Sequence, residues 1–140
     1  MTKAFTPSNL PLEERTVGRI LARQADRLAD KNFIETTSGN CISYRDMHLR
    51  SNQFARGTAA FGIESQEPVL VMLPDTIDYV TVWCGLAKRG AIEVPINLAY
   101  RKNILKRICN DSTAKKIIID CQYVERLEEI ADDLEHLDCV

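Results

Sequence analysis

The sequence predicts an α/β fold in which a parallel sheet is flanked by helices and preceded by a small N-terminal hairpin. Two observations lead to this prediction. From Pro68 onward, short apolar runs alternate with amphipathic helical patterns, and such alternation produces right-handed crossovers between parallel strands. The run that follows Pro68 is apolar at every position to Leu73, as expected for a strand that is covered on both faces.

The first third of the chain predicts a leader, a helix and a hairpin. Residues 1–15 are polar and carry two prolines, so we expect a loosely ordered leader. From Thr16, a plausible N-cap, apolar residues recur at steps of three and four up to Leu28, which predicts an amphipathic helix. Residues 33–36 and 41–43 are rich in β-formers and flank a Gly-Asn turn, which predicts a hairpin.

Two longer helices are predicted next, on either side of the strand at 68–73. The first spans 44–61 after the N-cap Ser43, and Gly62 closes it. Its predicted buried stripe is Met47, Ser51, Phe54, Ala55, Thr58 and Phe61. The second begins after Asp75 or Thr76, either of which can cap it, and ends at Arg89 before Gly90. Its predicted inward positions are Tyr79, Val80, Val82, Trp83, Leu86 and Ala87.

The remaining third continues the alternation. We expect strands at 91–94 and 116–119, separated by a helix over 102–110 that buries Ile104, Leu105 and Ile108. An acidic amphipathic helix is predicted over 123–137, and residues 138–140 are expected to open a further strand. The sheet therefore looks partial, with its continuation missing.

Composition excludes several classes of function. The 140 residues are 45% hydrophobic and 27% charged with a net charge of −2, so neither nucleic acid nor an anionic membrane is expected as a partner. The N-terminus lacks the apolar core of a signal peptide. Five widely spaced cysteines form no CxxC pair, which favours reduced thiols over a zinc site or a redox dithiol. We expect a cytoplasmic protein.

The residues that could carry catalysis are few. His48 and His136 lie in helical patterns without metal-ligand spacing, and a structural or solvated role is expected for both. Asp75 and Asp78 stand at a helix start, where acids cap free N–H groups more often than they bind a metal. No glycine-rich phosphate loop and no Gly-x-Ser-x-Gly elbow occur. We therefore expect no catalytic residue and no metal site.

One basic pair conflicts with its predicted position. Arg101 and Lys102 precede a helix whose N-terminus is already positive, whereas Lys88 and Arg89 suit a helix end. Such a conflict can mark a site for an anion such as a phosphate. Trp83 is interpreted as a core residue, not as a ligand contact.

Four blocks of the sequence resemble the adenylate-forming (AMP-binding) superfamily. They resemble its "T-Y-x-E-L … A-N-x-L-A … L-G-V" opening, its strand–Pro–helix segment, its "L-K-A-G-A-x-x-V-P-L-N" motif and its "N-D-S-G-A-K" turn. The matching residues are 42–47 with Asn52, Ala55 and 61–63, then 69–79, 86–97 and 110–115. Their order and spacing cover most of 17–120, and the stretch 95–105 looks most like acyl-CoA ligases of the carnitine/crotonobetaine-CoA or fatty-acyl-CoA branches.

The resemblance implies a two-step ligase. In this family a carboxylate attacks the α-phosphate of ATP to give an acyl-adenylate, and the CoA thiolate then displaces AMP. ATP, Mg²⁺ and CoA are thus the cofactors of the parent enzyme, and none is expected in this chain. Many relatives carry an arginine at the position of Ala99 that can reach the nucleotide part of CoA, and Arg101 is the candidate replacement.

The sequence thus predicts that residues 16–140 form the N-terminal subdomain of a ligase of fatty acid metabolism, cut before the phosphate loop and inactive alone. Its expected partner is the remainder of the ligase chain, and an exposed packing surface could support a homodimer. Two other readings stay open. One is a stand-alone interaction or small-ligand module with the same fold. The other is a flavodoxin-like nucleotide binder, which the missing phosphate loop disfavours.

Overall fold

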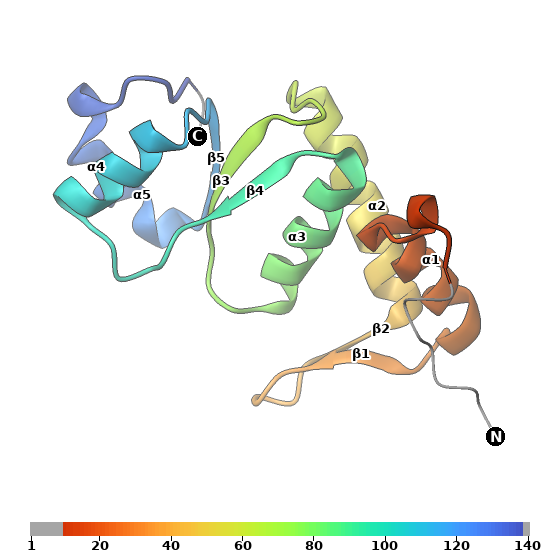
Figure 1. Ribbon diagram of the computed structural model, residues 1–140. Helices are drawn as coiled ribbons and strands as arrows, with labels where there is room; N and C mark the ends of the chain where they lie inside the picture. The colour runs from red at the N-terminus through yellow and green to blue at the C-terminus, as the bar shows by residue number, and fades with distance from the viewer. Residues whose placement is uncertain (1–9, 139–140) are drawn as a thin grey trace.

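A computed structural model describes residues 10–138 and shows an α/β arrangement (Figure 1). Three parallel strands, β3 (Pro68–Met72), β4 (Ile92–Pro95) and β5 (Lys116–Ile119), form a sheet in the order β4-β3-β5. A separate antiparallel hairpin contains β1 (Asn32–Glu35) and β2 (Cys41–Ser43). The predicted fold class, the hairpin and all three predicted sheet strands are confirmed.

Within residues 10–138, five α-helices surround these strands. They are α1 (Val17–Leu28), α2 (Tyr44–Ala60), α3 (Ile77–Arg89), α4 (Lys102–Asp111) and α5 (Val124–Glu128). Short 3-10 turns lie at η2 (Leu12–Glu14), η3 (Cys121–Tyr123) and η4 (Ala131–Asp133). In Figure 1, α4 and α5 lie on one side of the sheet and α3 on the other, with α2 and then α1 farther out.

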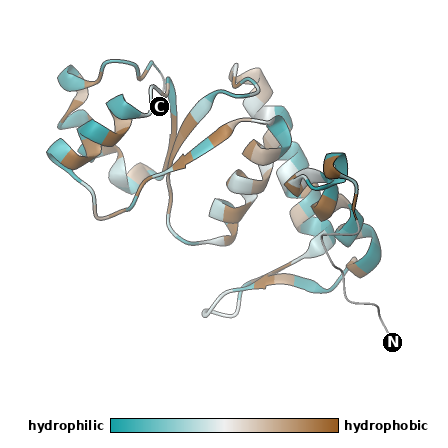
Figure 2. Cartoon of the chain, viewed as in Figure 1, coloured by the Kyte–Doolittle hydropathy of each residue, from teal (hydrophilic) through white to brown (hydrophobic). Residues whose placement is uncertain are grey.

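Strand β3 is buried on both faces, which explains its uninterrupted apolar sequence. Because side chains alternate along a strand, Val69 and Val71 face the cluster formed with α3, whereas Leu70 and Met72 face the cluster formed with α4 and α5. All four side chains are at most 1% exposed. Figure 2 shows hydrophobic stretches along the strands between the two layers of helices. The sheet is thus the shared wall of two cores.

Local capping chemistry sets the helix starts. The hydroxyls of Thr16, Ser43 and Thr76 each accept a hydrogen bond from a backbone N–H three residues later. Thr76, not Asp75, therefore caps α3. Gly90 ends α3 with φ of 80°, a left-handed conformation that costs little only for glycine.

Three positions predicted to be buried are exposed. Trp83, Ile104 and Phe61 are 43%, 57% and 75% exposed, so these predictions are wrong. Helix α3 buries two faces, one against the sheet and one against α2, and Trp83 lies on the side that remains. On α4 the buried stripe passes through Leu105 and Cys109 and leaves Ile104 outside it.

The prediction of one acidic helix over 123–137 is also wrong, because the segment is divided into η3, α5 and η4. Like charges at four-residue spacing, such as Glu125 with Glu129, oppose a continuous helix. The Asn110 side chain also binds the backbone on both sides of the break, donating to the Asp133 carbonyl at 2.9 Å and accepting from Glu135 N–H at 3.1 Å. Tertiary hydrogen bonds therefore replace helical ones.

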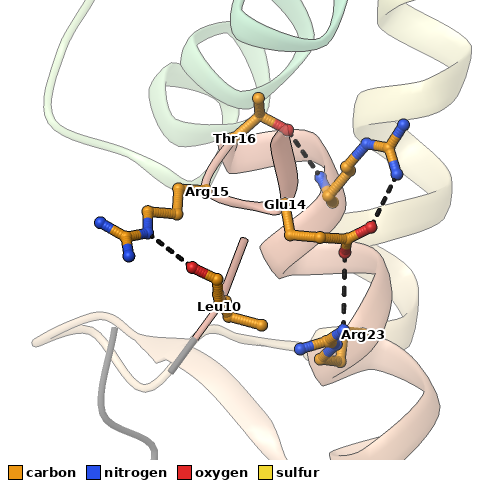
Figure 3. A network of polar contacts seen from close by, with 6 residues as sticks. Leu10, Glu14, Arg15, Thr16 and Arg23 are labelled. Carbon is orange, nitrogen blue, oxygen red and sulfur yellow. Dashed lines mark hydrogen bonds and ion pairs between the residues drawn. The ribbon is translucent and has the colours of Figure 1, made fainter. Parts of the chain in front are cut away.

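Residues 10–15, which precede α1, form several polar contacts (Figure 3). Leu10 is 9% exposed, and its carbonyl accepts a hydrogen bond from the Arg15 guanidinium at 3.0 Å. Glu14 forms ion pairs with Arg19 at 2.9 Å and Arg23 at 3.5 Å. The rest of the predicted leader, residues 1–9, lies outside the described residues, as do residues 139–140 of the expected further strand.

Candidate functional site

The loop after β4, residues 96–101, lies at the carboxyl end of the sheet, where α/β proteins commonly bind ligands. The Asn97 side chain accepts a hydrogen bond from Ala99 N–H at 2.8 Å, and Tyr100 N–H donates to the Asn97 carbonyl at 3.0 Å. These bonds form a tight turn that fixes the path of the backbone towards Arg101.

Helix α5 supports the same loop from the side. The Arg126 guanidinium donates to the Leu98 carbonyl and lies 4.5 Å from the centre of the Tyr123 ring. The guanidinium is thus held by a hydrogen bond and by a cation–π contact. The loop is thus held by a segment that is distant from it in sequence.

Arg101 itself is exposed at the start of α4. It occupies the N-cap position without capping the helix, and it forms no ion pair with any residue of 10–138. Lys102 follows with φ of 49°, and the first turn of α4 contains no acid. The arrangement offers positive charge at a positive helix end, which is suited to an anion.

The other polar candidates do not converge on a site. Asp78 pairs with Arg50 at 3.4 Å, and Asp75 is exposed. Within residues 10–138 no three His, Cys, Asp or Glu side chains are placed to hold a metal ion. His48 is half-buried and His136 is exposed, as the sequence predicted.

A partly buried polar cluster that sequence reasoning missed surrounds Lys88. Its ammonium donates to the Ser51 hydroxyl at 2.7 Å, to the Asn52 side-chain carbonyl at 2.8 Å and to the His48 backbone carbonyl at 3.0 Å. Three donors thus meet three acceptors, all of them on α2. No carboxylate forms an ion pair with Lys88 among the described residues.

The cluster also constrains the imidazole of His48. Asn52 Nδ2 lies 3.0 Å from His48 Nε2, and Lys88 Nζ lies 3.4 Å from His48 Nδ1. Burial, with the positive charge of Lys88, lowers the pKa of His48, and Asp26 opposes this effect. Burial also lowers the pKa of Lys88 itself. Both groups therefore resist protonation more than they would in water.

Two glycines allow the helices to pack closely around this lysine. A Cβ on Gly18 of α1 would lie 3.1 Å from Lys88 Cγ, and a Cβ on Gly85 of α3 would lie 2.5 Å from Phe54 Cδ1. The available sequence signal was Ser51, a polar residue on the predicted buried stripe of α2, because a buried hydroxyl requires a partner. The cluster closes on itself and joins α2 to α3, so we interpret it as structural.

An acidic side chain outside this cluster, Glu93 on β4, is partly buried and lies against Tyr79 of α3. Burial raises the pKa of Glu93, and the hydrogen bond from Tyr79 opposes that rise. Its other oxygen, Oε1, has no hydrogen-bond partner among the described residues. A raised pKa favours the neutral acid, which removes most of the cost of that orphaned oxygen.

An apolar groove of about 530 Å³ lies between the end of α2 and β5. On α2 it is lined by Phe54, Thr58 and Phe61, and on β5 by Lys116 and the three isoleucines that follow it. The exposed thiol of Cys121 lies at its margin. The groove contains no cluster of charges, so it is suited to apolar side chains and not to a phosphate.

The strand order has a direct bearing on the nucleotide-binding alternative. The chain passes from β3 to β4 on one side and then to β5 on the other, which places a switch point between β3 and β5. The turn after β3 is Leu73-Pro74-Asp75, and Thr76 then caps α3. Without glycines this turn cannot wrap a phosphate as a flavodoxin-like loop would, so the geometry does not favour that reading.

The described residues thus form an α/β fold with a structural helix cluster, a basic loop at the carboxyl end of the sheet and an apolar groove. The family model described as AMP-binding enzyme matches residues 21–140. The chain belongs to the AMP-binding enzyme family, of which it forms an N-terminal part, and the resemblance predicted from four motifs is confirmed.

Curated relatives include CoA ligases of two kinds. The chain is 26% identical over 129 residues to 4-coumarate--CoA ligase 3 of Arabidopsis thaliana, covering 91% of this chain and 22% of that protein. It is 29% identical over 113 residues to a long-chain-fatty-acid--CoA ligase of Escherichia coli, covering 80% of this chain and 19% of that one. The chain thus spans about a fifth of the length of these relatives.

Solved structures agree with this assignment. A crystal structure of the anthranilate CoA ligase AuaEII in complex with anthranoyl-AMP superposes with a TM-score of 0.83 at 25% identity, covering 97% of this chain and 27% of that one. The chain therefore reproduces a contiguous part of a larger ligase fold. Among residues 10–138, no helix is long and apolar enough to cross a membrane.

Proposed function

We propose that this chain is the N-terminal part of an ATP-dependent acyl-CoA ligase and contributes structure, together with one basic loop, to the parent enzyme. The family match over residues 21–140 is the observation that supports this proposal most strongly. In the parent reaction, a carboxylate attacks the α-phosphate of ATP with loss of pyrophosphate. The thiolate of CoA then attacks the acyl-adenylate, and AMP leaves.

The 140-residue chain by itself is expected to be inactive. Its sequence contains no glycine-rich phosphate loop, and its described residues form no metal site. Stabilising the charge that develops during phosphoryl chemistry requires such donors or a bound cation. ATP, Mg²⁺ and CoA are thus proposed for the parent enzyme, and the cytoplasm remains the predicted compartment.

Within the parent enzyme, Arg101 is proposed to contact a phosphate of CoA. It is exposed, lacks an acidic partner among residues 10–138, and follows Ala99, which offers no charge of its own. A guanidinium binds phosphate oxygens through paired donors, a geometry that lysine cannot reproduce. The neighbouring Lys102 would add positive charge without that geometry.

The test compares acyl-CoA formation by the complete ligase and by its R101A variant. We expect R101A to raise the KM for CoA by roughly tenfold, the scale of one charge-assisted hydrogen bond, with ATP–pyrophosphate exchange unchanged. The 140-residue chain should show no exchange. Arg107, which is exposed on the same helix and pairs with Asp111, provides the matched control as R107A.

Three results would contradict the proposal in different ways. Robust exchange by the 140-residue chain would contradict its inactivity. An unchanged KM for CoA in R101A would show that Arg101 does not contribute to CoA binding. A reading frame that ends after Val140 would instead favour the stand-alone binding module.

A further inference from the structure

We propose that Arg126 of α5 is a positioning residue for CoA binding, which holds the loop of residues 96–101 (the Arg101 loop) in the conformation that presents Arg101. This inference rests on the proposed function, because it adds a second residue to the same phosphate contact. Three features of the structure support it: a peptide unit held on both sides, the fixed position of the Arg126 guanidinium and the strained backbone that follows the loop.

One peptide unit of the Arg101 loop is held by both of its polar groups. Its carbonyl belongs to Leu98 and accepts a hydrogen bond from the Arg126 guanidinium. Its N–H belongs to Ala99 and donates to the Asn97 side chain at 2.8 Å. Because a peptide unit is planar, the two hydrogen bonds together fix its orientation. Without Arg126 the bond to Asn97 remains, but both of its ends belong to the loop and move with it.

The guanidinium of Arg126 is itself fixed, which suits support of the loop better than contact with a ligand. It is half-buried, lies 4.5 Å from the centre of the Tyr123 ring and forms no ion pair among residues 10–138. A planar guanidinium can donate in its plane while its face packs on an aromatic ring, which an ammonium group cannot do. Arg101, in contrast, is exposed. We therefore assign the ligand contact to Arg101 and the support of the loop to Arg126.

The backbone at the end of the loop also requires support. Lys102 has φ of 49°, a left-handed conformation that a residue with a side chain rarely adopts, and α4 begins at this residue. At the other end, Ile96 is 5% exposed and its N–H donates to the Val71 carbonyl at 2.8 Å, so the loop leaves the sheet from a fixed point. The loop thus connects a fixed start to a strained end, and the bond from Arg126 holds its middle.

Hydrogen exchange in the 140-residue chain tests this hold directly. The amides of Ala99 and Tyr100 both donate to Asn97. In R126A we expect them to exchange roughly tenfold faster, the scale of one charge-assisted hydrogen bond. The amide of Ile96 donates to the sheet and should keep its rate, which separates a change in the loop from unfolding of the chain.

The kinetics of the complete ligase test the consequence for CoA. R126A should raise the KM for CoA by roughly threefold to tenfold, up to the effect of R101A, with kcat at saturating CoA little changed. When R126A is added to R101A, the KM should change by less than about twofold, because Arg126 acts only through Arg101. The matched control is R107A, which removes an exposed arginine of α4 and should change neither the KM nor the exchange rates.

The outcomes separate this inference from the proposed function. Unchanged exchange of the Ala99 amide in R126A would overturn the inference even if the complete ligase forms acyl-CoA. A normal KM in R126A beside a raised KM in R101A would overturn it and leave the proposed function standing. A further severalfold rise when R126A is added to R101A would also overturn it, because Arg126 would then contact CoA by itself. Faster exchange in R126A with an unchanged KM in R101A would support the hold on the loop and contradict the proposed contact between Arg101 and CoA.

Discussion

The seam between α2 and α3 differs from two exposed features of the molecule, the Arg101 loop and the groove beside Phe61, in how its polar groups are satisfied. At the seam, Lys88 is surrounded by acceptors from α2, and Gly85 lets the two helices approach closely. At the two exposed features, Arg101 forms no ion pair within residues 10–138, and Phe61 is 75% exposed. The comparison teaches that the seam satisfies its own polar groups, whereas the two exposed features leave a cation and an aromatic ring uncovered by the described residues.

The strongest test of this comparison replaces the two cations. K88M should lower the free energy of unfolding by about 2–3 kcal/mol, because Asn52 and Ser51 lose a charged donor in a partly buried site. R101A should change it by less than about 0.5 kcal/mol, as expected for an exposed side chain. Urea unfolding of both variants measures the difference. If K88M leaves the free energy of unfolding unchanged, burying the ammonium costs as much free energy as its hydrogen bonds contribute.

A smaller change in the free energy of unfolding is expected when a glycine of the seam or of the groove is replaced by alanine. G85A should destabilise the chain by about 1–3 kcal/mol, since the new methyl group would lie 2.5 Å from Phe54 and force the helices apart. G57A, on α2 beside the groove, meets nothing within 4 Å and should be neutral or stabilising by up to about 1 kcal/mol. Thermal unfolding measures both values. Equal destabilisation by G85A and G57A would show that α2 and α3 are not tightly packed at Gly85.

The smallest expected effect is a dependence of stability on pH at the seam. The pKa of His48 is lowered in the folded chain, so as the pH falls below about 6.5 the unfolded state takes up a proton first. Stability should therefore decrease between pH 7 and 5. Asp26 faces the same imidazole and reduces the effect, while Lys88 strengthens it.

Urea midpoints measured at each pH test this dependence. H48Q should flatten the slope, and H136Q, which changes an exposed residue outside the seam, should preserve it. A slope that survives in H48Q would assign the titration to another group.

The sequence was most informative where the signal is local. Thr16, Ser43 and Gly90 were predicted as helix boundaries and act as such, because a cap requires only nearby backbone groups. The strand after Pro68 was equally clear, because burial on both faces leaves an uninterrupted apolar run. The family resemblance combined several such local signals.

Prediction failed where burial depends on distant partners. Periodicity indicates that Trp83 and Phe61 lie on apolar helices, but not which faces are covered by the sheet, by another helix or by nothing. The acidic helix over 123–137 failed because Asn110, which is remote in sequence, binds its backbone. Pattern alone cannot weigh such competition.

The sequence by itself determined the fold class, the helix starts and the family, since these depend on hydrophobic period, capping residues and motif order. Only the tertiary structure decided the enclosure of Lys88, the free position of Arg101 and the groove beside Phe61. The physical reason is that a partly buried cation, an exposed cation and an exposed aromatic ring differ in what surrounds them, and the packing of distant elements sets those surroundings.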